Sequence, residues 1–450
     1  MTKKELTEKI NSKQAGEIFS ELYGEREIDV IRKRYLSLVT GMMENKDDFS
    51  ETGISEAADS LRVFSAPGRT ELGGNHTDHN RGKVLAASIQ LDSAAVVRKR
   101  DDNIVFFRST GYPDVKVKLI DSSGEPDLQP KTEEEGTTEA LVRGIAAGLR
   151  RRGRAAGGFS ANADSTVLSG SGLSSSAAVE VLLGRIFDSL YGEGKLKPLE
   201  IAQIGQYAEN AYFGKPCGLM DQTACAAGGA AAIDFADAAD PMVKQINFNP
   251  AGAGYALCIV NTGGSHADLT ADYASIPAEM KSVAALFGKS VLRELDRETV
   301  INSAADVRKS AGDRALLRSL HFFDENERVD AMTNALIEIE NGEKDAINNY
   351  LYLVNESGAS SWELLQNIYS PHRPGIQGVS AALALTKTFF QKQKLKGACR
   401  VHGGGFAGTI QAYIPLNAMD SYRVYIEAVF GSGSVTILRI RPRGAVELFF

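Results

Sequence analysis

Three glycine-rich segments of this 450-residue chain place polar side chains beside sequence typical of strands and helices. The first, residues 66–80, reads APGRTELGGNHTDHN and includes an arginine, two histidines and an aspartate. The other two are 169–178 (SGSGLSSSAA) and 402–408 (HGGGFAG). Polar groups this dense beside a predicted core strand usually line a site rather than a surface. Together, the three segments constrain the fold and the function more firmly than any one of them does.

The middle segment joins a strand-like run, 158–167, to a sequence with helical spacing over 177–187. Either Ser174 or Ser175 is a natural N-cap for that helix. Glycines in the loop allow backbone N–H groups to turn inward, and the first helical turn adds unpaired donors with partial positive charge. A nucleotide phosphate is the commonest anion at such a site, although a plain capping loop is the alternative. The loop lacks the lysine of a Walker A sequence, which excludes an ordinary P-loop.

In this order, the three segments resemble the galactokinase branch of the GHMP small-molecule kinase superfamily. The first resembles the galactokinase signature, the second the Gly-Leu-Ser-Ser-Ser-Ala phosphate loop, and the third the Gly-Gly-Gly-Phe-Gly-Gly loop. Further matches are CGLMDQ at 217–222, NTGGSH at 261–266 followed by Tyr273, and VNES at 354–357. The resemblance runs from about Leu61 to the C-terminus. It implies an α+β, two-lobed GHMP kinase fold with the active site in the cleft between the lobes.

Composition limits the classes of protein to consider. A chain of this length with 43% hydrophobic and 24% charged residues can bury a large core. The net charge of -7 argues against a nucleic-acid surface, and the basic run 150–154 is expected to be a solvated helix end. With no long apolar stretch and no hydrophobic N-terminal signal, we expect a cytoplasmic protein that does not bind membranes. We also expect a monomer or weak homodimer. The four cysteines lack zinc-like spacing and are expected to be reduced thiols.

The chain is predicted to have three parts. Residues 1–60 form a helical N-terminal extension packed on the first lobe, either a cap over the sugar site or additional helical cladding. Residues 61–230 form the N-terminal lobe with the phosphate loop, and residues 231–450 form the C-terminal lobe.

Residue periodicity predicts the elements of these parts. Helices are expected at 5–23, 28–43, 138–152, 174–191, 199–211, 274–287, 304–320, 326–341 and 343–356. Strands are expected at 93–98, 103–107, 115–120, 158–167, 256–260, 409–414 and 435–440.

Asp221 is the candidate general base. It has no charged neighbour from Pro216 to Ile233 and lies at a predicted helix start, so a buried carboxylate there needs a partner. The structural alternative is an aspartate that caps the helix. The resemblance favours the base, and it places Arg69 on the signature arginine, where a permanent charge keeps Asp221 ionised and faces the transferred phosphate. Otherwise Arg69 would be a surface ion-pair partner.

The resemblance also assigns the ATP and Mg²⁺ sites. Ser176 and Glu209 occupy positions where the family supplies oxygen ligands for Mg²⁺, which commonly takes one or two from the protein. An exposed helical glutamate is the alternative for Glu209. The expected ATP-binding residues are Gly170, Ser171, Gly172, Leu173, Ser174, Ser175, Ser176 and Ala177.

The expected sugar-binding residues are Asn75, His76, Asp78, Gly218 and Tyr273. The chain departs from the family pattern at four positions: Asn75 replaces a glutamate that contacts the C6 end of galactose, His79 a tyrosine, Ile276 an arginine and Ala407 a glycine. An amide in place of an acidic acceptor removes charge from the C6 pocket. Galacturonate is therefore an alternative substrate to galactose, while the simpler interpretation is that Asn75 still bonds the 6-hydroxyl.

The sequence therefore predicts an ATP-dependent sugar 1-kinase that makes an α-sugar 1-phosphate, most simply from galactose. A non-catalytic sugar and nucleotide sensor is the alternative from another class. Asp221, Arg69 and the intact phosphate loop favour the enzyme, since a sensor needs none of the transfer chemistry. The motif His76-Thr-Asp78 argues against another GHMP member such as a mevalonate or homoserine kinase. His402 is expected to be a hydrogen-bonded core histidine.

Overall fold

The computed structural model describes residues 1–44, 60–168, 170–264 and 269–450. The polar stretch that follows the N-terminal helices, Ser169 at the start of the phosphate loop, and His266 lie outside the described residues. Among the described helices, none has the length and apolarity that crossing a bilayer requires.

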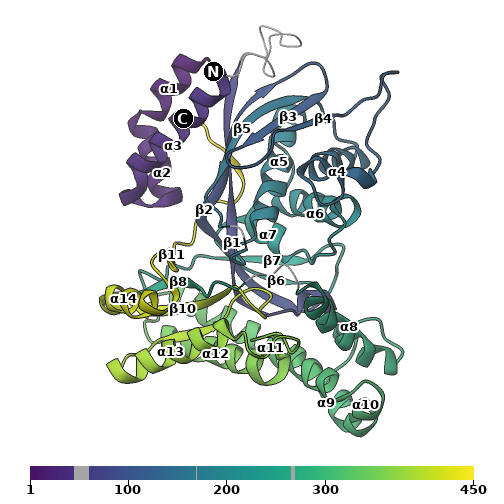
Figure 1. Ribbon diagram of the computed structural model, residues 1–450, viewed down its shortest axis with the longest axis vertical. Coiled ribbons are helices and arrows are strands. Elements are labelled where there is room, and N and C mark those ends of the chain that lie inside the picture. The colour runs from purple at the N-terminus through teal and green to yellow at the C-terminus, as the bar shows by residue number, and fades with distance from the viewer. Residues whose placement is uncertain (45–59, 169, 265–268) are drawn as a thin grey trace.

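The long antiparallel strands β1 and β2 lie at the centre of the larger sheet (Figure 1). Its main path runs β12-β1-β2-β5-β3-β4, β6 pairs with both β2 and β7, and the β3–β5 pair is parallel. The strands are β1 (Leu61–Gly73), β2 (Lys83–Lys99), β3 (Ile104–Ser109), β4 (Val115–Lys118), β5 (Phe159–Ser165), β6 (Ala230–Asp234), β7 (Met242–Ile246) and β12 (Val446–Glu447). The strands predicted at 93–98, 103–107, 115–120 and 158–167 are confirmed.

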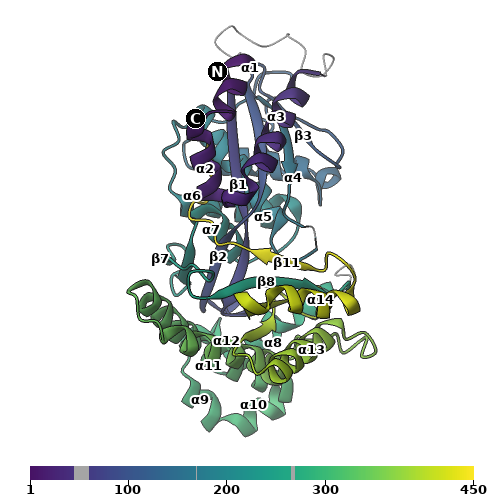
Figure 2. The same cartoon turned by 90° about the vertical axis from the view of Figure 1, so that its left-hand side faces the viewer.

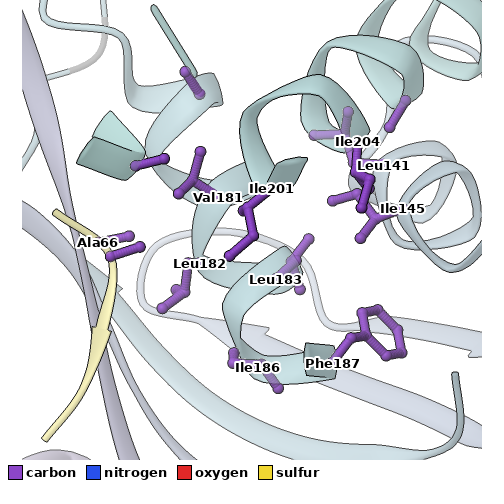
Figure 3. Close-up of a cluster of buried hydrophobic side chains, with 14 of the residues drawn as sticks. Ala66, Leu141, Ile145, Val181, Leu182, Leu183, Ile186, Phe187, Ile201 and Ile204 are labelled. Carbon is purple, nitrogen blue, oxygen red and sulfur yellow. The ribbon is translucent and has the colours of Figure 1, made fainter. Parts of the chain in front are cut away.

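Both faces of this sheet are covered, which explains the continuous apolar run in β2. Ala95 and Val97 pack with the helices on one face, and Ala94 and Val96 pack on the other. On the first face, α5 lies against the strands with α4 and α6 outside it (Figure 3). These helices are α4 (Thr138–Arg151), α5 (Ser175–Tyr191), α6 (Pro198–Ala208) and α7 (Met220–Ala227).

The N-terminal helices cover the opposite face of the sheet (Figure 2). They are α1 (Lys3–Ile10), α2 (Lys13–Tyr23) and α3 (Ile28–Glu44). Their apolar residues share a core with β1, β2 and the C-terminal Leu448 and Phe450, so they act as cladding of the sheet. The prediction of one helix over 5–23 was wrong, because Asn11 ends α1 and the Ser12 hydroxyl caps α2.

The smaller sheet has the order β11-β8-β10-β9 and is antiparallel. Its strands are β8 (Tyr255–Asn261), β9 (Ala398–Val401), β10 (Thr409–Pro415) and β11 (Val435–Leu438). The accompanying helices are α8 (Thr270–Leu286), α9 (Arg297–Asn302), α10 (Ala304–Ser310), α11 (Asp313–Glu340), α12 (Ala346–Ser360), α13 (Gly378–Gln393) and α14 (Met419–Phe430). The predicted strands at 256–260, 409–414 and 435–440 are confirmed.

The separate helices predicted at 304–320 and 326–341 were wrong. The first breaks at Gly312, which has a φ of 96°, and a single helix, α11, then continues to Glu340. No glycine or proline interrupts α11, and the residues expected to form the gap include the buried His321, Phe322 and Glu325. Tertiary burial therefore keeps this stretch helical.

The lobes share strands and a core. The C-terminal end of β1 contributes Leu72, and the first half of β2 contributes Leu85 and Ile89, to one hydrophobic cluster. This cluster also contains Val329 of α11 and Tyr413 of β10. The larger sheet also takes β6, which starts at residue 230, and β7 and β12 from beyond it, and β12 pairs with β1. The division of the chain at residue 230 stays a prediction, and the strand pairing crosses it.

A buried carboxylate ties the chain ends to the larger sheet. Asp92 of β2 is fully buried and accepts the Tyr23 hydroxyl at 2.7 Å. The Arg34 Nη1 of α3 lies 2.5 Å from Asp92 Oδ1, and Arg441 Nη1 lies 3.3 Å from Oδ2. Burial raises the pKa of Asp92, but the charges of Arg34 and Arg441 outweigh it, so the pKa lies below its usual value.

We predict that Asp92→Asn destabilises the protein by about 3 kcal/mol at pH 7, because the buried Arg441 loses its charge partner and Arg34 keeps only Asp164. This loss of stability should shrink as pH falls through the native pKa of Asp92. The wild-type carboxylate is then protonated, and it is uncharged like the asparagine. Urea unfolding of both proteins at several pH values measures it.

A matched control is Asp29→Asn, which removes an exposed carboxylate 3.9 Å from Arg32. Its effect should stay within about 0.5 kcal/mol. Equal, small effects of the two substitutions would contradict the stabilising role of Asp92.

Candidate active site

Arg69 reaches the site because β1 is irregular at this point. The register between β1 and β2 shifts between Pro67 and Arg69, which re-aims the side chain that follows. A Cβ on Gly68 would lie 2.7 Å from the Leu173 carbonyl, so glycine lets β1 approach the phosphate loop. The Arg69 N–H then donates to that same carbonyl at 3.0 Å. The strand and the phosphate loop are therefore joined beside Arg69.

Asp221 meets this arginine from the first turn of α7, where the sequence predicts a helix start. Arg69 Nε donates to Asp221 Oδ1 and Arg69 Nη2 to Oδ2, each at 2.8 Å. The third guanidinium nitrogen donates to the Gly172 carbonyl of the phosphate loop. The side chain of Arg69 is 7% exposed and that of Asp221 33%, so the carboxylate keeps one open side.

Asp221 is held in its ionised form. Burial raises its pKa, but the charge of Arg69 and the hydrogen bonds from Ser174 and Arg69 outweigh that effect, and the pKa lies below its usual value. A carboxylate in this state is an unprotonated acceptor throughout the neutral range. The Asp221 carboxylate can therefore accept a proton next to the phosphate loop.

The phosphate loop has alternating left-handed backbone. Gly170, Gly172 and Ser174 have φ values of 71°, 73° and 60°. Successive turns of this kind direct backbone N–H groups into an anion-binding concavity. Leu173 and Ala177 are buried in the hydrophobic cores, which anchors the loop and the start of α5. The Thr409 hydroxyl donates to the Ser171 carbonyl at 2.9 Å and ties the loop to the second lobe.

The expected helix cap at the start of α5 needs a correction. Ser174 does occupy the N-cap position, but its side chain makes no capping hydrogen bond. Its hydroxyl instead donates to Asp221 Oδ2. The tertiary partner takes the hydroxyl because the left-handed backbone of Ser174 is not the extended conformation of an ordinary N-cap.

Ser176 and Glu209 are brought together at the other side of the loop. The Ser176 hydroxyl lies 3.4 Å from Glu209 Oε1, and Gln222 Nε2 donates to Glu209 Oε2 at 2.9 Å. Glu209 begins a π-helical turn, Glu209–Phe213, that follows α6 and turns this buried carboxylate toward α5 and α7. A cation already lies on it, since Lys215 Nζ is 3.0 Å from Oε1.

These oxygens suit Mg²⁺, which prefers hard ligands and takes few from the protein. In the described part of the chain, no group of three or more histidine, cysteine, aspartate or glutamate side chains could hold a metal by itself. A hydroxyl and one carboxylate, completed by substrate phosphates and water, therefore match the ordinary arrangement for Mg²⁺ rather than a closed structural site.

Three of the expected sugar-binding residues lie together. A Cβ on Gly218 would fall 1.9 Å from Asp78 Oδ2, so the glycine packs directly on that carboxylate. His76 has a φ of 62° and its Nε2 lies 2.9 Å from the Gly404 carbonyl of the third glycine-rich segment. Burial lowers the pKa of His76 to about 3, which makes it a neutral hydrogen-bonding group.

Asn75 is buried behind these residues, with its amide occupied by protein groups. Its Nδ2 donates to the Glu71 carboxylate at 3.0 Å and to the Gly403 carbonyl at 2.7 Å. Its Oδ1 accepts the Asn367 amide at 2.7 Å. Arg400 in turn lies 2.5 Å from Glu71. The geometry gives Asn75 a role in joining the two loops, and its contact with the C6 end of a sugar stays a prediction.

The third glycine-rich segment connects the sugar-binding residues. The Tyr273 hydroxyl donates to the Gly405 carbonyl at 3.0 Å. His402 is buried between the hydroxyls of Thr70 and Thr409, each 3.0 Å from a ring nitrogen, and burial lowers its pKa to about 3. This confirms a hydrogen-bonded core histidine.

The loop around Ala407 explains how the chain tolerates its missing glycine. The residue with a positive φ is the preceding Phe406, at 60°, whereas Ala407 does not have a positive φ. The Phe406 N–H is held by the Asn367 carbonyl at 2.5 Å. The methyl group of Ala407 therefore costs the loop little.

Sequence reasoning missed several partners in the site. Lys215 and Gln222 contact Glu209 from positions shortly after it in the chain. The Ser174–Asp221 contact and the Glu71–Arg400 pair join segments far apart in the chain. A signal existed for Glu71, since it lies in the same polar segment as Arg69 and Asn75. The other partners follow from tertiary proximity, which no residue pattern encodes.

Two family models match the chain in the regions that build this site. Residues 140–229 match the N-terminal domain of GHMP kinases, and residues 49–99 match the galactokinase galactose-binding signature. A galactokinase from Streptomyces coelicolor is 32% identical over 383 residues, covering 84% of this chain and 91% of that protein. A galactokinase from Actinobacillus pleuropneumoniae is 31% identical, covering 80% of this chain and 86% of that protein. The chain belongs to the galactokinase family of GHMP kinases.

Solved structures support the same fold for this galactokinase-family chain. The structure of Lactococcus lactis galactokinase complexed with galactose matches with a TM-score of 0.72 at 24% identity, covering 93% of this chain and all of that one. The mevalonate kinase of Methanococcus jannaschii matches with a TM-score of 0.54 at 13% identity, covering 85% of this chain and 98% of that one. The α+β GHMP kinase fold predicted from the sequence is confirmed.

We predict that Arg69→Gln raises the pKa of Asp221, because the opposing charge is lost while the burial remains. A titration followed by carboxyl ¹³C NMR measures the change directly. The control is Arg108→Gln, which removes the β3 arginine that pairs with Asp114. It should leave the Asp221 titration unchanged. An Asp221 pKa that stays where it is in Arg69→Gln would contradict the account given above.

Proposed function

We propose that the protein is an ATP-dependent galactokinase that converts D-galactose and ATP to α-D-galactose 1-phosphate and ADP. The observation that carries the proposal is the two-point hydrogen bonding of Arg69 to Asp221 at 2.8 Å, directly beside the phosphate loop. Membership of the galactokinase family supports the sugar and the nucleotide.

In this proposal Asp221 is the general base. Its carboxylate accepts the proton of the anomeric hydroxyl as that oxygen bonds to the γ-phosphorus and the bond to the ADP oxygen breaks. Arg69 keeps the carboxylate ionised and places a permanent positive charge beside the phosphate oxygens. His76, Asp78, Gly218 and Tyr273 bind the sugar hydroxyls, and Asp78 can accept from two of them at once.

Residues 170–177 bind the phosphates of ATP, and Ser176 with Glu209 holds Mg²⁺. When bound, Mg²⁺ would neutralise charge on the phosphate oxygens. The buried Glu209 carboxylate supports this assignment, because its Oε1 lies 3.4 Å from the Ser176 hydroxyl. Gln222 keeps the second oxygen of Glu209 in place.

Transfer chemistry distinguishes the enzyme from a sugar and nucleotide sensor. A sensor needs a sugar pocket and a phosphate loop, but no ionised base held beside the loop. Keeping a carboxylate and a guanidinium largely out of water costs solvation free energy that binding alone does not require. The Arg69–Asp221 pair therefore favours the kinase.

We predict that Asp221→Asn lowers kcat at least about 100-fold while galactose binding persists, because the amide cannot accept the proton. A coupled ADP-release assay measures turnover and calorimetry measures binding of galactose. Asp188→Asn, a buried carboxylate paired with Arg185 on α5, is the control for the loss of a buried charge outside the site. Turnover of Asp221→Asn at the wild-type rate would remove Asp221 from the base role.

Galactose is proposed as the sugar, with galacturonate as the alternative that the amide of Asn75 suggests. The hydrogen bonds of Asn75 to Glu71, Gly403 and Asn367 support the simpler choice, because they leave the amide without a free donor for a C6 carboxylate. The buried Glu71 carboxylate behind it would also disfavour a second negative charge.

We predict turnover of galactose, turnover of 6-deoxygalactose within about 10-fold of it, and none of galacturonate. The reason is that the hydrogen bonds of Asn75 to Glu71 and Gly403 leave its amide no free donor for a group at C6. ADP release with Mg-ATP across these sugars, with glucose and mevalonate as controls, tests this. Turnover of galacturonate alone would instead make Asn75 the determinant of specificity. The absence of ADP release with every sugar would favour the sensor.

A further inference from the structure

Ser174 adopts a backbone conformation that serine disfavours. Its φ and ψ are 60° and 58°, in the left-handed region. The other two left-handed positions of the phosphate loop, Gly170 and Gly172, are glycines, which adopt this region without strain. A strained residue at a functional site persists where the surrounding structure requires it. The conformation alone would be better served by glycine, so the side chain at this position calls for an explanation.

The hydroxyl of Ser174 is used across the site rather than locally. It makes no capping hydrogen bond to α5, although it occupies the N-cap position. It donates to Asp221 Oδ2, which also accepts Arg69 Nη2. Asp221 Oδ1 accepts Arg69 Nε at 2.8 Å and also lies 2.7 Å from Arg69 Nη2. The Arg69 guanidinium therefore contacts both carboxylate oxygens, whereas the Ser174 hydroxyl contacts Oδ2 alone.

We propose that the Ser174 hydroxyl is a positioning group for Asp221, which holds Oδ2 from the phosphate loop and fixes the orientation of the carboxylate that receives the proton of the sugar. This inference rests on the proposed role of Asp221 as the base. The proton passes from the anomeric hydroxyl to the Asp221 carboxylate, while the sugar oxygen bonds to the γ-phosphorus and the ADP oxygen leaves with the bonding electrons. Ser174 keeps its own proton throughout.

The same hydrogen bond couples the base to the phosphate loop. Ser174 follows Leu173, whose carbonyl accepts the Arg69 N–H, and Arg69 also bonds the Gly172 carbonyl. Base, arginine and loop therefore form one closed set of contacts. A loop displaced from its phosphate-binding position would break the contact between Ser174 and Oδ2 and leave the carboxylate held by Arg69 alone.

Other charged or titratable groups also face Asp221 and act on its protonation. They come from β1, α5, the segment before α7, α7 itself and the segment before β10, and they are Arg69, Glu180, Lys215, Cys225 and His402. None of them changes when Ser174 is replaced. A change in the pH profile of a Ser174 variant can then be assigned to the hydroxyl.

Two substitutions separate the hydroxyl from the strain. Ser174→Gly removes the hydroxyl and relieves the left-handed strain, and Ser174→Ala removes the hydroxyl and keeps the strain. We expect kcat to fall about 10-fold in both, as a hydrogen bond to a charged group is lost. The KM for galactose should stay within about 3-fold, and the acid limb of the kcat profile should move to higher pH, since Asp221 loses a donor that stabilises its ionised form.

Lys394→Gly is the matched control. Lys394 is an exposed residue with a φ of 52° at the C-terminal end of α13. Both glycine variants should melt above their parent or at the same temperature, because each relieves a left-handed residue. Only Ser174→Gly should lose kcat.

Several results would overturn the proposal. Wild-type kcat and pH profile in Ser174→Gly would show that the hydroxyl has no role. Loss of kcat in Ser174→Ala alone would assign the effect to backbone strain, and a raised KM for ATP with unchanged kcat would assign Ser174 to nucleotide binding. Wild-type turnover in Asp221→Asn would instead refute the base on which the proposal rests, so the two failures are distinguishable.

Discussion

The pairing of Arg69 with Asp221 is the interaction on which the rest of the site depends. A guanidinium that is 7% exposed and a carboxylate that is 33% exposed are stable together because each satisfies the other, whereas either alone would carry an uncompensated charge. The pair also fixes geometry, since Arg69 comes from a strand and Asp221 from a helix start. The phosphate loop completes it through the Gly172 carbonyl and the Ser174 hydroxyl. One electrostatic requirement thereby aligns three segments far apart in the chain.

Close backbone approach is the second requirement, and glycine meets it at the points where segments touch. Gly68 lets β1 reach the phosphate loop, and Gly218 lets the segment before α7 lie on Asp78. The glycines of the third segment expose carbonyls that His76, Asn75 and Tyr273 contact. Because β1 and β2 run from the first core into the core shared by the lobes, these approaches are held by packed strands rather than by loops alone.

Local sequence patterns predicted much of the architecture. The sequence predicts strands at 115–120 and 93–98, and the structure shows a half-exposed strand at the first and a fully covered one at the second. Errors arose where a local signal met a tertiary one. The expected break near residue 321 is absent because His321 and Glu325 bond to the backbone of Asn75 and Gly74 from inside α11. In the site, the residue types identified Arg69, Asp221 and Glu209 as chemical groups, whereas their partners Ser174, Lys215 and Gln222 followed only from the fold.

The sequence by itself determined the family, the α+β fold, many of the elements and the chemical groups, because these are recorded in local periodicity and in motifs of fixed order. Tertiary structure alone decided which groups meet. It showed that Asn75 is occupied by Glu71, Gly403 and Asn367, and that residues 1–44 cover the sheet. It also showed that the Ser174 hydroxyl serves Asp221 rather than a helix end. The physical reason is that a hydrogen bond tolerates only a few tenths of an ångström of error in the distance between its two atoms. Atoms from distant segments reach that accuracy only once the cores have packed.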